Sequence, residues 1–442
     1  SLTSADTVNL GDGADTLETT DAMDLADADF TNVTNVETLT VATTSHGMTL
    51  TMGAETSEAG ITTVTTGTGT NAIVVGAGHT ADLTINQTSA GTDTFDASAY
   101  TGALTVNMNQ TGQGADTVTG GTGTSDTLNI TAVSGTEALT ADDLDTVTAF
   151  ENIVVANNVA FSLTTDDNTN ATVAMDVDAT AMSTTLFTFD GSEEDDGTFN
   201  ITAGGTAAHN ITLGQLGDTI TSTSTAAVTV VGTAGANTIT TGIGADKITL
   251  GTGNDTITSG AGADTILLAT ANLTTDDTIN GGDGTDLLKS TNAIDLADAD
   301  FTNVTNIETL TVTTATHNMT LTLGAESSEA GLKTITTGSG ASTNVIRVGA
   351  GHTAALTIDQ SSAGTDTFDA SAYTGALTVN LNQTGQAADT VTGGTGTNDT
   401  LNITPVAGTE ALTADDLDTV TAFENVVVAN NVAFSMTTAD EM

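Results

Sequence analysis

The chain has 442 residues, of which 56 are Asp or Glu and only 4 are Lys or Arg, so its formal net charge is −52 at pH 7. So few cations cannot neutralise phosphates, which excludes nucleic acid as a partner, and an anionic membrane surface would repel the chain. The absence of Cys excludes a disulfide framework. Because 38% of residues are hydrophobic and alternate with polar ones, we expect a folded chain whose acidity is offset by bound divalent cations or by a saline habitat.

A long internal repeat organises the chain. Leu25–Val41 recurs as Leu296–Val312 with one change, starting 271 residues later, and Gly91–Val106 recurs unchanged as Gly364–Val379. We therefore predict a first repeat unit over residues 1–276 and a second over 277–442 that stops partway. No Pro-rich or Ser-rich linker separates the copies, which predicts a continuous rod rather than beads on a string.

Short strands with glycine-rich turns between them are predicted along most of each copy. A short helical turn is expected near Asp24, before a strand that ends at Val41, and another short helix around Ala141–Leu144. Met48–Met52 alternates apolar and polar residues strictly, as a half-buried strand does. Further strands are predicted at Ile61–Thr65, Ala72–Val75, Leu83–Ile85, Leu104–Met108 and Ile153–Val155.

Four nonapeptides run without a gap over Gly232–Leu267, each with Gly, then Asp or Asn, then Ile at fixed places. The glycines allow tight turns, the Asp offers a hard oxygen ligand for Ca²⁺, and the Ile points into the core. Two nonapeptides make one coil, so Asn237 is expected beside Asp255 on one side. Asp246 is expected beside Asp264 on the other side.

Related segments extend this pattern to both copies. They are Leu10–Leu17, its counterpart Gly281–Leu288, and two nonapeptides over Thr111–Leu128 whose second copy has Ala387 in place of a glycine. Asn237 stands where the other nonapeptides have Asp, which predicts a weaker site there. The predicted calcium ligands are Asp12, Asp15, Asp116, Asp126, Asn237, Asp246, Asp255, Asp264, Asp283, Asp286, Asp389 and Asp399.

The fold class that fits these patterns is all-β. Strands every 8–15 residues are compatible with an antiparallel sandwich array as well. We favour a parallel β-solenoid of the β-roll or β-helix type, built from the tandem repeat of about 271 residues, because the nonapeptide has the spacing of a solenoid coil.

Catalysis has little support in the sequence, which contains no Cys nucleophile, no H-E-x-x-H and no G-x-S-x-G, so no enzyme activity is expected. The His residues are scattered, and we interpret four of them as surface turn residues rather than zinc ligands. The acidic run Glu193–Asp196 reads as a solvated loop. Asp93 and Asp96 fit calcium ligands and turn caps equally well. Ice binding is disfavoured, because no threonine row follows the single GTGND motif.

The nonapeptide block and the modules DLADADFTNVTNVETLTV and GTDTFDASAYTGALTV resemble bacterial RTX-type surface-layer and giant adhesin proteins. The resemblance implies type I secretion, calcium-triggered folding outside the cell and self-assembly at the cell surface. The expected partners are other copies of the chain, in a lattice or fibre, and a cell-surface polysaccharide. Two alternatives remain open: the non-catalytic stalk of an RTX adhesin, and the non-catalytic solenoid of a secreted enzyme.

Overall fold

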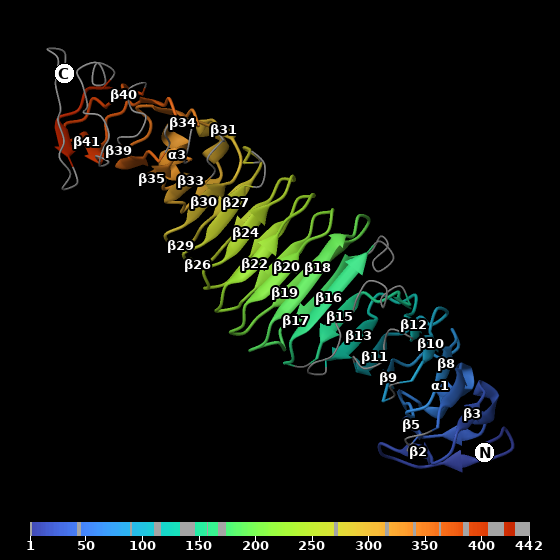
Figure 1. The fold of residues 1–442 in the computed structure, drawn as a ribbon. Helices are drawn as coiled ribbons and strands as arrows, with labels where there is room; N and C mark the ends of the chain where they lie inside the picture. Colours follow the sequence, from blue (N-terminus) through green and yellow to red (C-terminus); the bar gives the residue numbers. More distant parts are fainter. Residues whose placement is uncertain are drawn as a thin grey trace. The chain divides into compact units, whose positions relative to one another are not determined.

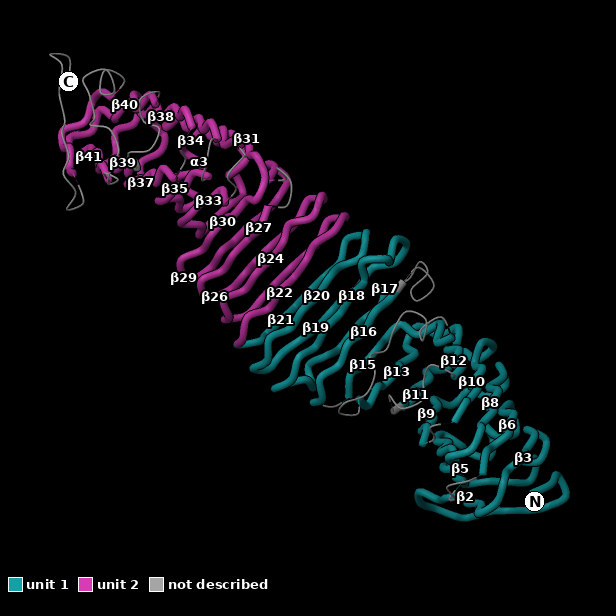
Figure 2. The backbone as a smooth tube through the Cα atoms, in the orientation of Figure 1, with its two compact units in different colours: residues 1–225 teal, residues 226–442 magenta. Residues whose placement is uncertain are grey.

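The computed structural model describes residues 2–41, 46–88, 91–109, 116–132, 146–156, 158–166, 174–268, 273–313, 318–338, 342–361, 364–382, 389–404 and 420–428. The chain forms two compact units, Ser1–Thr225 and Ala226–Met442 (Figure 2). Within each unit the described residues form an all-β parallel solenoid, in which strands of consecutive coils lie side by side (Figure 1). The fold class predicted from the sequence is confirmed. The repeat boundary at residue 276 stays a prediction.

In the first unit most coils give one strand to a long parallel sheet and a second strand to one of two further parallel sheets. One sheet contains, in order, β2 (Thr16–Thr19), β5 (Thr38–Val41), β7 (Thr63–Thr65), β9 (Leu83–Asn86), β11 (Leu104–Asn109), β13 (Thr127–Thr131), β15 (Asn152–Val155), β17 (Ala174–Ala179), β19 (Thr198–Ala203) and β21 (Thr219–Ser222). Facing strands are β3 (Met23–Leu25), β6 (Met48–Met52), β8 (Ala72–Val75), β10 (Thr94–Asp96), β12 (Thr117–Thr119) and β14 (Val147–Thr148), then β16 (Phe161–Asp166), β18 (Phe187–Glu193) and β20 (His209–Thr212). A separate pair joins β1 (Val8–Asn9) to β4 (Val33–Thr34).

The second unit is built in the same way. Its longest run contains β22 (Val228–Val231), β24 (Lys247–Leu250), β27 (Thr265–Leu268), β30 (Leu287–Ser290), β33 (Thr309–Val312), β35 (Thr334–Thr336), β37 (Leu356–Asp359), β39 (Leu377–Asn382), β41 (Thr400–Thr404) and β43 (Asn425–Val428). The others are β23 (Thr238–Thr240), β25 (Thr256–Thr258), β28 (Thr278–Asn280) and β32 (Val304–Thr305); β31 (Ile294–Leu296), β34 (Met319–Leu323), β36 (Val345–Val348), β38 (Thr367–Asp369), β40 (Thr390–Thr392) and β42 (Val420–Thr421); and β26 (Ala261–Gly262) with β29 (Asp283–Gly284).

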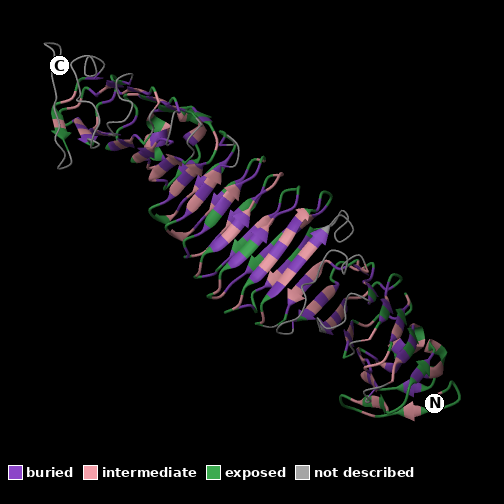
Figure 3. Ribbon diagram, in the orientation of Figure 1, coloured by how far each residue is buried: buried purple, intermediate pink, exposed green. Residues whose placement is uncertain are grey.

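The core is a stack of apolar side chains, one layer per coil. Leu39 pairs with Val64, and Val64 with Ile85, and all three side chains are 0% exposed. Alternation puts the neighbouring Thr side chains on the outer face, as the banding of buried and exposed residues in Figure 3 shows. Each fully buried aliphatic side chain stabilises the fold by about 1.5–3 kcal/mol relative to exposure. β-branched residues suit this pleated surface, which explains the abundance of Thr, Val and Ile.

The strand predictions are confirmed with small shifts at their ends. Met48–Met52 is β6 as predicted, and the strand expected at Ile61–Thr65 begins two residues later, at Thr63. The helical turn expected near Asp24 is the 3-10 helix η1 (Asp27–Phe30), repeated as η3 (Asp298–Phe301). The helix expected around Ala141–Leu144 lies outside the described residues.

Two further short helices, α1 (Ala54–Ala59) and α3 (Ala325–Glu329), were not predicted. The Asp27 carboxylate caps α1 by accepting the backbone N–H groups of Glu55 at 3.2 Å and Thr56 at 2.9 Å. The helix ends at Gly60, whose φ of 96° an L side chain rarely adopts. Five or six residues are too few for helical periodicity to show in the sequence.

Candidate calcium site

One row of acidic side chains runs from coil to coil through the nonapeptide block. We call Asp246, Asp264, Asp286 and Glu308 the Asp264 row. Asp246 Oδ1 accepts the backbone N–H of Val228 at 2.7 Å. The N–H of Asp246 in turn donates to Asp264 Oδ1 at 2.7 Å, and that of Asp264 to Asp286 Oδ1 at 2.8 Å. Glu308 ends the row by accepting the N–H of Asp286 on Oε2 at 2.9 Å.

A second row, Asn237, Asp255 and Asp277, lies on the other side of the coil; we call it the Asp255 row. The N–H of Asn237 donates to Asp255 Oδ1 at 2.9 Å, and the N–H of Asp255 donates to Asp277 Oδ1 at 2.9 Å. The eighteen-residue stacking of Asn237 on Asp255 and of Asp246 on Asp264 is therefore as expected. Asp277 Oδ2 also has a donor, the N–H of Thr274 at 2.8 Å.

The Asp264 row holds buried carboxylate oxygens that accept no hydrogen bond: Oδ2 of Asp246, Asp264 and Asp286. Burying a charged carboxylate oxygen that has no partner destabilises the fold by several kcal/mol, and a bound cation would offset this cost. Burial also raises the pKa of Asp264 to about 6 and moves the pKa of Asp246 and Asp286 upward. Orphaned hard oxygens at successive coils are what Ca²⁺ requires, so this row fits the ion that its sequence predicts.

The carboxylates supply only part of a coordination shell. Among the residues that the structure describes, no three His, Asp or Glu side chains converge into a metal cluster. Calcium takes 6–8 oxygen ligands, typically at about 2.3–2.6 Å, including backbone carbonyls. The remaining ligands of the Asp264 row would therefore be carbonyl oxygens of the adjoining glycine turns, or water.

The site predicted near the N-terminus is split by the structure. Asp15 has the same environment as its repeat counterpart Asp286: its N–H donates to Glu37 Oε2 at 2.7 Å, and its own Oδ2 is buried without a partner. Asp12 and Asp283, the other predicted ligands of these segments, are exposed, Asp12 in a bend and Asp283 in strand β29. Asp15 therefore shares the orphaned carboxylate that defines the Asp264 row, whereas Asp12 and Asp283 do not.

Asp126 and Asp399, predicted ligands in the long modules, are buried but fully bonded. Asp126 accepts the N–H of Leu104 at 2.8 Å on Oδ1 and of Gly121 at 2.6 Å on Oδ2. Asp399 repeats this with Leu377 and Gly394, at 2.9 and 2.8 Å. Asp116 and Asp389 are likewise buried. The turns before these last two, residues 110–115 and 383–388, lie outside the described part.

Several members of such rows were missed by sequence reasoning. They are Glu37, Glu151, Asp218, Asp277 and Glu308. Asp93, which the sequence left open as a ligand or a turn cap, also belongs to such a row. Each stands two residues before a buried apolar strand residue, as in Asp218-Thr-Ile220 and Asp277-Thr-Ile279. An acidic residue followed by Thr or Asn and then by an apolar residue is therefore the signal that would have found them. Asp96, by contrast, caps a turn by accepting the N–H of Ser98 at 3.0 Å.

Two expectations about polar residues were wrong. His79 and His352 are fully buried rather than on surface turns, because each ring packs inside a coil; the ring of His79 lies 5.9 Å from the ring of Tyr100. His46, also expected on a surface turn, is half-buried, and His209, which was not assigned to a turn, is fully buried. His317 lies outside the described residues. In the acidic run, Glu194 is buried, because its side chain turns inward to accept the N–H of Gly197 at 2.9 Å. That burial raises the pKa of Glu194 to about 7.

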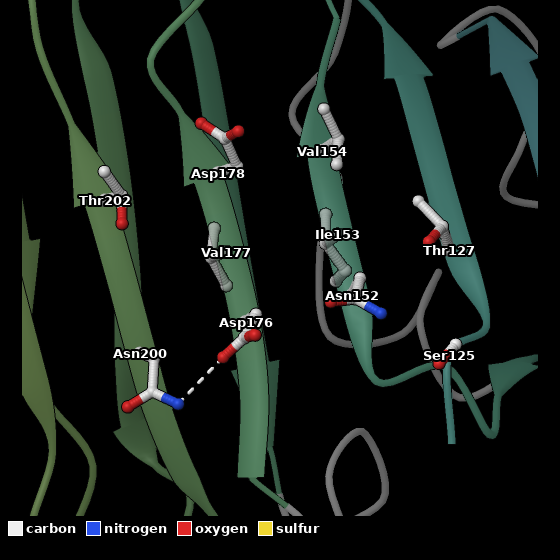
Figure 4. Close-up of a pocket in the computed structure, with 10 residues that line it drawn as sticks. All are labelled: Ser125, Thr127, Asn152, Ile153, Val154, Asp176, Val177, Asp178, Asn200 and Thr202. Atoms are coloured by element: carbon white, nitrogen blue, oxygen red, sulfur yellow. Dashed lines mark hydrogen bonds between the residues drawn. The ribbon is translucent and has the colours of Figure 1, made fainter.

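The first unit also has an open groove of about 530 Å³ on the outer face of β13, β15, β17 and β19. Hydroxyl, amide and carboxylate groups line it together with Ile153, Val154 and Val177, and Asn200 Nδ2 donates to Asp176 Oδ1 at 2.8 Å (Figure 4). Asp176 is exposed and Asp178 half-buried, so water solvates both carboxylates. The groove thus lacks the buried, unpartnered oxygens that point to a cation in the Asp264 row.

A family model, the RTX calcium-binding nonapeptide repeat (4 copies), matches residues 231–266 and 274–291. No curated protein and no solved structure was found to match the chain. The matched segments contain the Asp255 row and the Asp264 row as far as Asp286. The chain therefore carries RTX calcium-binding nonapeptide repeats in a β-solenoid, and Ca²⁺ is its cofactor. The matched ranges do not include the predicted ligands Asp12, Asp15, Asp116, Asp126, Asp389 and Asp399.

The calcium-free chain is expected to be more stable at about pH 5 than at about pH 7.5. Burial raises the pKa of Asp264, Asp218, Asp116 and Asp389 from 3.8 to about 6, so between these values the folded state binds more protons than the unfolded state. The stabilisation that these groups contribute to the folded state is therefore fully present below pH 3.8, and it is lost as the pH rises through about 6.

Saturating calcium should reverse this trend, because the ligands bind the ion only when deprotonated. Thermal melting at the two pH values, followed by circular dichroism, measures the direction of both trends when it is done in calcium-stripped and in calcium-containing buffers. A calcium-free melting temperature that rises steadily across this pH range would contradict the assignment. The carboxyls whose pKa is lowered, such as Asp96 and Asp369, titrate below this window and leave its sign unchanged. Burial lowers the pKa of His79 and His352 from 6.5, which opposes the trend, but the carboxyls with a raised pKa are more numerous and set the sign.

Proposed function

We propose that the protein is extracellular structural material: a calcium-loaded β-solenoid that assembles with copies of itself into a surface layer, sheath or matrix fibre. The observation that carries the proposal is the Asp264 row, whose buried carboxylates lack partners until a cation is supplied. Binding free energy at such a row becomes folding free energy, so folding is conditional on the calcium of the extracellular medium. Proteins with RTX repeats are typically secreted, and no helix in the described part is long and apolar enough to cross a membrane.

The near-identical copies support self-association. Outward threonines recur at equivalent places, such as Thr51 on β6 and Thr322 on β34, both of which are exposed. Each chain thus presents the same surface more than once, and a contact made by one copy can be made by the next. Repeated weak contacts on one chain add through effective concentration, which favours a lattice or fibre. A cell-surface polysaccharide is a further proposed partner.

A structural role also agrees with a Ser, His and Asp arrangement in the described residues that resembles a catalytic triad. Ser327 Oγ lies 3.3 Å from His352 Nδ1, close to Asp298. Both Ser327 and His352 are fully buried, and Asp298 accepts backbone N–H groups at the start of α3 rather than orienting the imidazole. No substrate carbonyl can reach this hydroxyl, so the group stabilises a helix end. We propose that the chain is not an enzyme.

The test is a calcium titration of the stripped protein, followed by far-UV circular dichroism and light scattering together. We expect β-signal to increase with calcium, as the nonapeptide block folds, and scattering to rise with it. β-signal that appears while the chain stays monomeric would favour the alternative function, a non-catalytic stalk of an RTX adhesin. A chain that is fully folded and monomeric without calcium would contradict both functions.

A further inference from the structure

The long modules contain a buried carboxylate pair that is bridged by an amide. In the first unit, Gln87 Nε2 donates to Asp93 Oδ2 at 3.0 Å and to Asp116 Oδ2 at 2.6 Å. The N–H of Asp93 donates to Asp116 Oδ1 at 2.7 Å. Asp93 Oδ1 accepts both the N–H and the Nδ2 of Asn71, at 2.8 and 2.9 Å. Every carboxylate oxygen of the pair therefore has a donor from the chain itself, whereas the amide oxygen Oε1 of Gln87 is buried and accepts no hydrogen bond.

The second unit repeats the arrangement. Gln360 Nε2 donates to Asp366 Oδ2 at 3.0 Å and to Asp389 Oδ2 at 2.6 Å. The N–H of Asp366 donates to Asp389 Oδ1 at 2.8 Å. An amide NH₂ has two hydrogens, and both are used, one for each carboxylate. The recurrence at nearly the same distances shows that the bridge is a regular feature of the module.

In the nonapeptide block, the position that Gln87 has in the long module is held by Thr or Ser. Thr241 and Ser259 precede Asp246 and Asp264, as Gln87 precedes Asp93, but their hydroxyls donate to the backbone carbonyls of Ser259 and Gly281, both at 2.9 Å. These hydroxyls lie close enough to Asp246 and Asp264 to lower the pKa of both carboxyls against the larger effect of burial, but no donor reaches the Oδ2 atoms with hydrogen-bond geometry. The two kinds of row thus share the backbone ladder through Oδ1 and differ in what reaches Oδ2.

We propose that Gln87 and Gln360 occupy the place that calcium takes in the nonapeptide block, so that these coils of the long module fold without calcium. Asp116 and Asp389, although predicted as ligands from their nonapeptide spacing, then serve as acceptors for an internal amide. The chain consequently has two classes of coil, one stabilised by metal and one by its own side chains. This inference concerns local folding and is independent of whether the folded chains assemble.

Hydrogen exchange of the whole chain, measured by mass spectrometry with and without calcium, tests the proposal directly. Peptides covering 83–96 and 356–369 should keep the same protection after calcium is removed. Peptides covering 246–290 should exchange at least about tenfold faster, which corresponds to about 1.4 kcal/mol of lost local stability. Equal loss of protection in all of these peptides would overturn the proposal, whatever light scattering reports about assembly.

The variant Gln87→Glu tests the shared place. It sets a third carboxylate against Asp93 and Asp116, and the first-unit coil is expected to become calcium-dependent: unprotected in chelator and protected again when calcium is added. Gln360 in the same molecule is the internal control, and Gln215→Glu, at an exposed glutamine, is the external one. If the protection of the Gln87→Glu coil does not depend on calcium, or if added calcium does not restore it, the amide does not occupy the place of the ion.

Discussion

Replacing Asp264 with Asn is expected to raise the calcium concentration needed to saturate the nonapeptide block by at least about tenfold, equivalent to about 1.4 kcal/mol. Asp264 lies in the middle of its row, between Asp246 and Asp286, and its Oδ2 is buried without a partner. The Asn side chain keeps an oxygen for the N–H of Asp246 but removes the charge that attracts the ion. Isothermal titration calorimetry with calcium measures the change.

The same substitution should stabilise the calcium-free protein. An unpartnered buried carboxylate destabilises the fold, and a neutral amide of the same shape removes that cost. Chemical unfolding in chelator is therefore expected to give a higher midpoint for Asp264→Asn than for the wild type, with the order reversed in saturating calcium. Asp276→Asn is the matched control, because Asp276 is exposed next to Asp277 and should change neither quantity. A variant that loses stability equally in both buffers would mean that Asp264 is a structural acceptor only.

The two rows of the nonapeptide block are therefore unequal, although their sequences look alike. Asp277, at the end of the Asp255 row, has its Oδ2 bonded by Thr274 at 2.8 Å, whereas the Asp264 row leaves Oδ2 atoms unbonded at successive coils. Calcium should consequently bind first along the Asp264 row. Glu308 extends this row into the following module, where its carboxylate accepts the N–H of Asp286. Calcium bound here would thus stabilise the point where the nonapeptides join the long repeat.

The coil period, the core and most strands could be predicted because they depend on residues close together in the sequence. Glycine, acidic and apolar residues at fixed spacing are enough to predict the stacking of Asp246 on Asp264. Whether a carboxylate needs an ion could not be predicted in this way. The donor that satisfies Asp116 is Gln87, which lies 29 residues away and one coil earlier. Only the stacking of the coils in the structure shows that the Gln87 amide reaches the Asp116 carboxylate.

The buried histidines show the same limit. His79 stands in the glycine-rich stretch GAGHT, which reads as a surface turn. Its ring is buried because it packs against Tyr100 from a later coil and contacts Thr56 Oγ1, at 3.3 Å, from helix α1. Neither neighbour is close in sequence, and α1 itself is too short to predict. The stacking of the Asp264 and Asp255 rows and of the core could thus be predicted from local sequence patterns. Which polar groups are buried, and which find hydrogen-bond partners, depends on contacts between coils.

Gly253→Ala is expected to unfold the nonapeptide block or to cost at least about 3 kcal/mol even in saturating calcium. A Cβ on Gly253 would lie 1.6 Å from the carbonyl oxygen of Gly235, in the turn one coil earlier. The obstructing oxygen belongs to the backbone, so no side-chain rotation relieves the overlap, and the coils would have to separate. That separation would break the β23–β25 pairing, in which Thr238 faces Thr256.

The control for this prediction is Gly76→Ala, where the nearest atom to the added Cβ is the carbonyl oxygen of Met52 at 3.2 Å, a contact that a small shift accommodates. Its cost should stay within about 1 kcal/mol. Urea unfolding in saturating calcium, followed by circular dichroism, gives both values. Because the predicted damage from Gly253→Ala is steric, added calcium should not restore it, which separates it from Asp264→Asn. Wild-type stability of Gly253→Ala would mean that the glycine turns are not stacked in backbone contact as the structure places them.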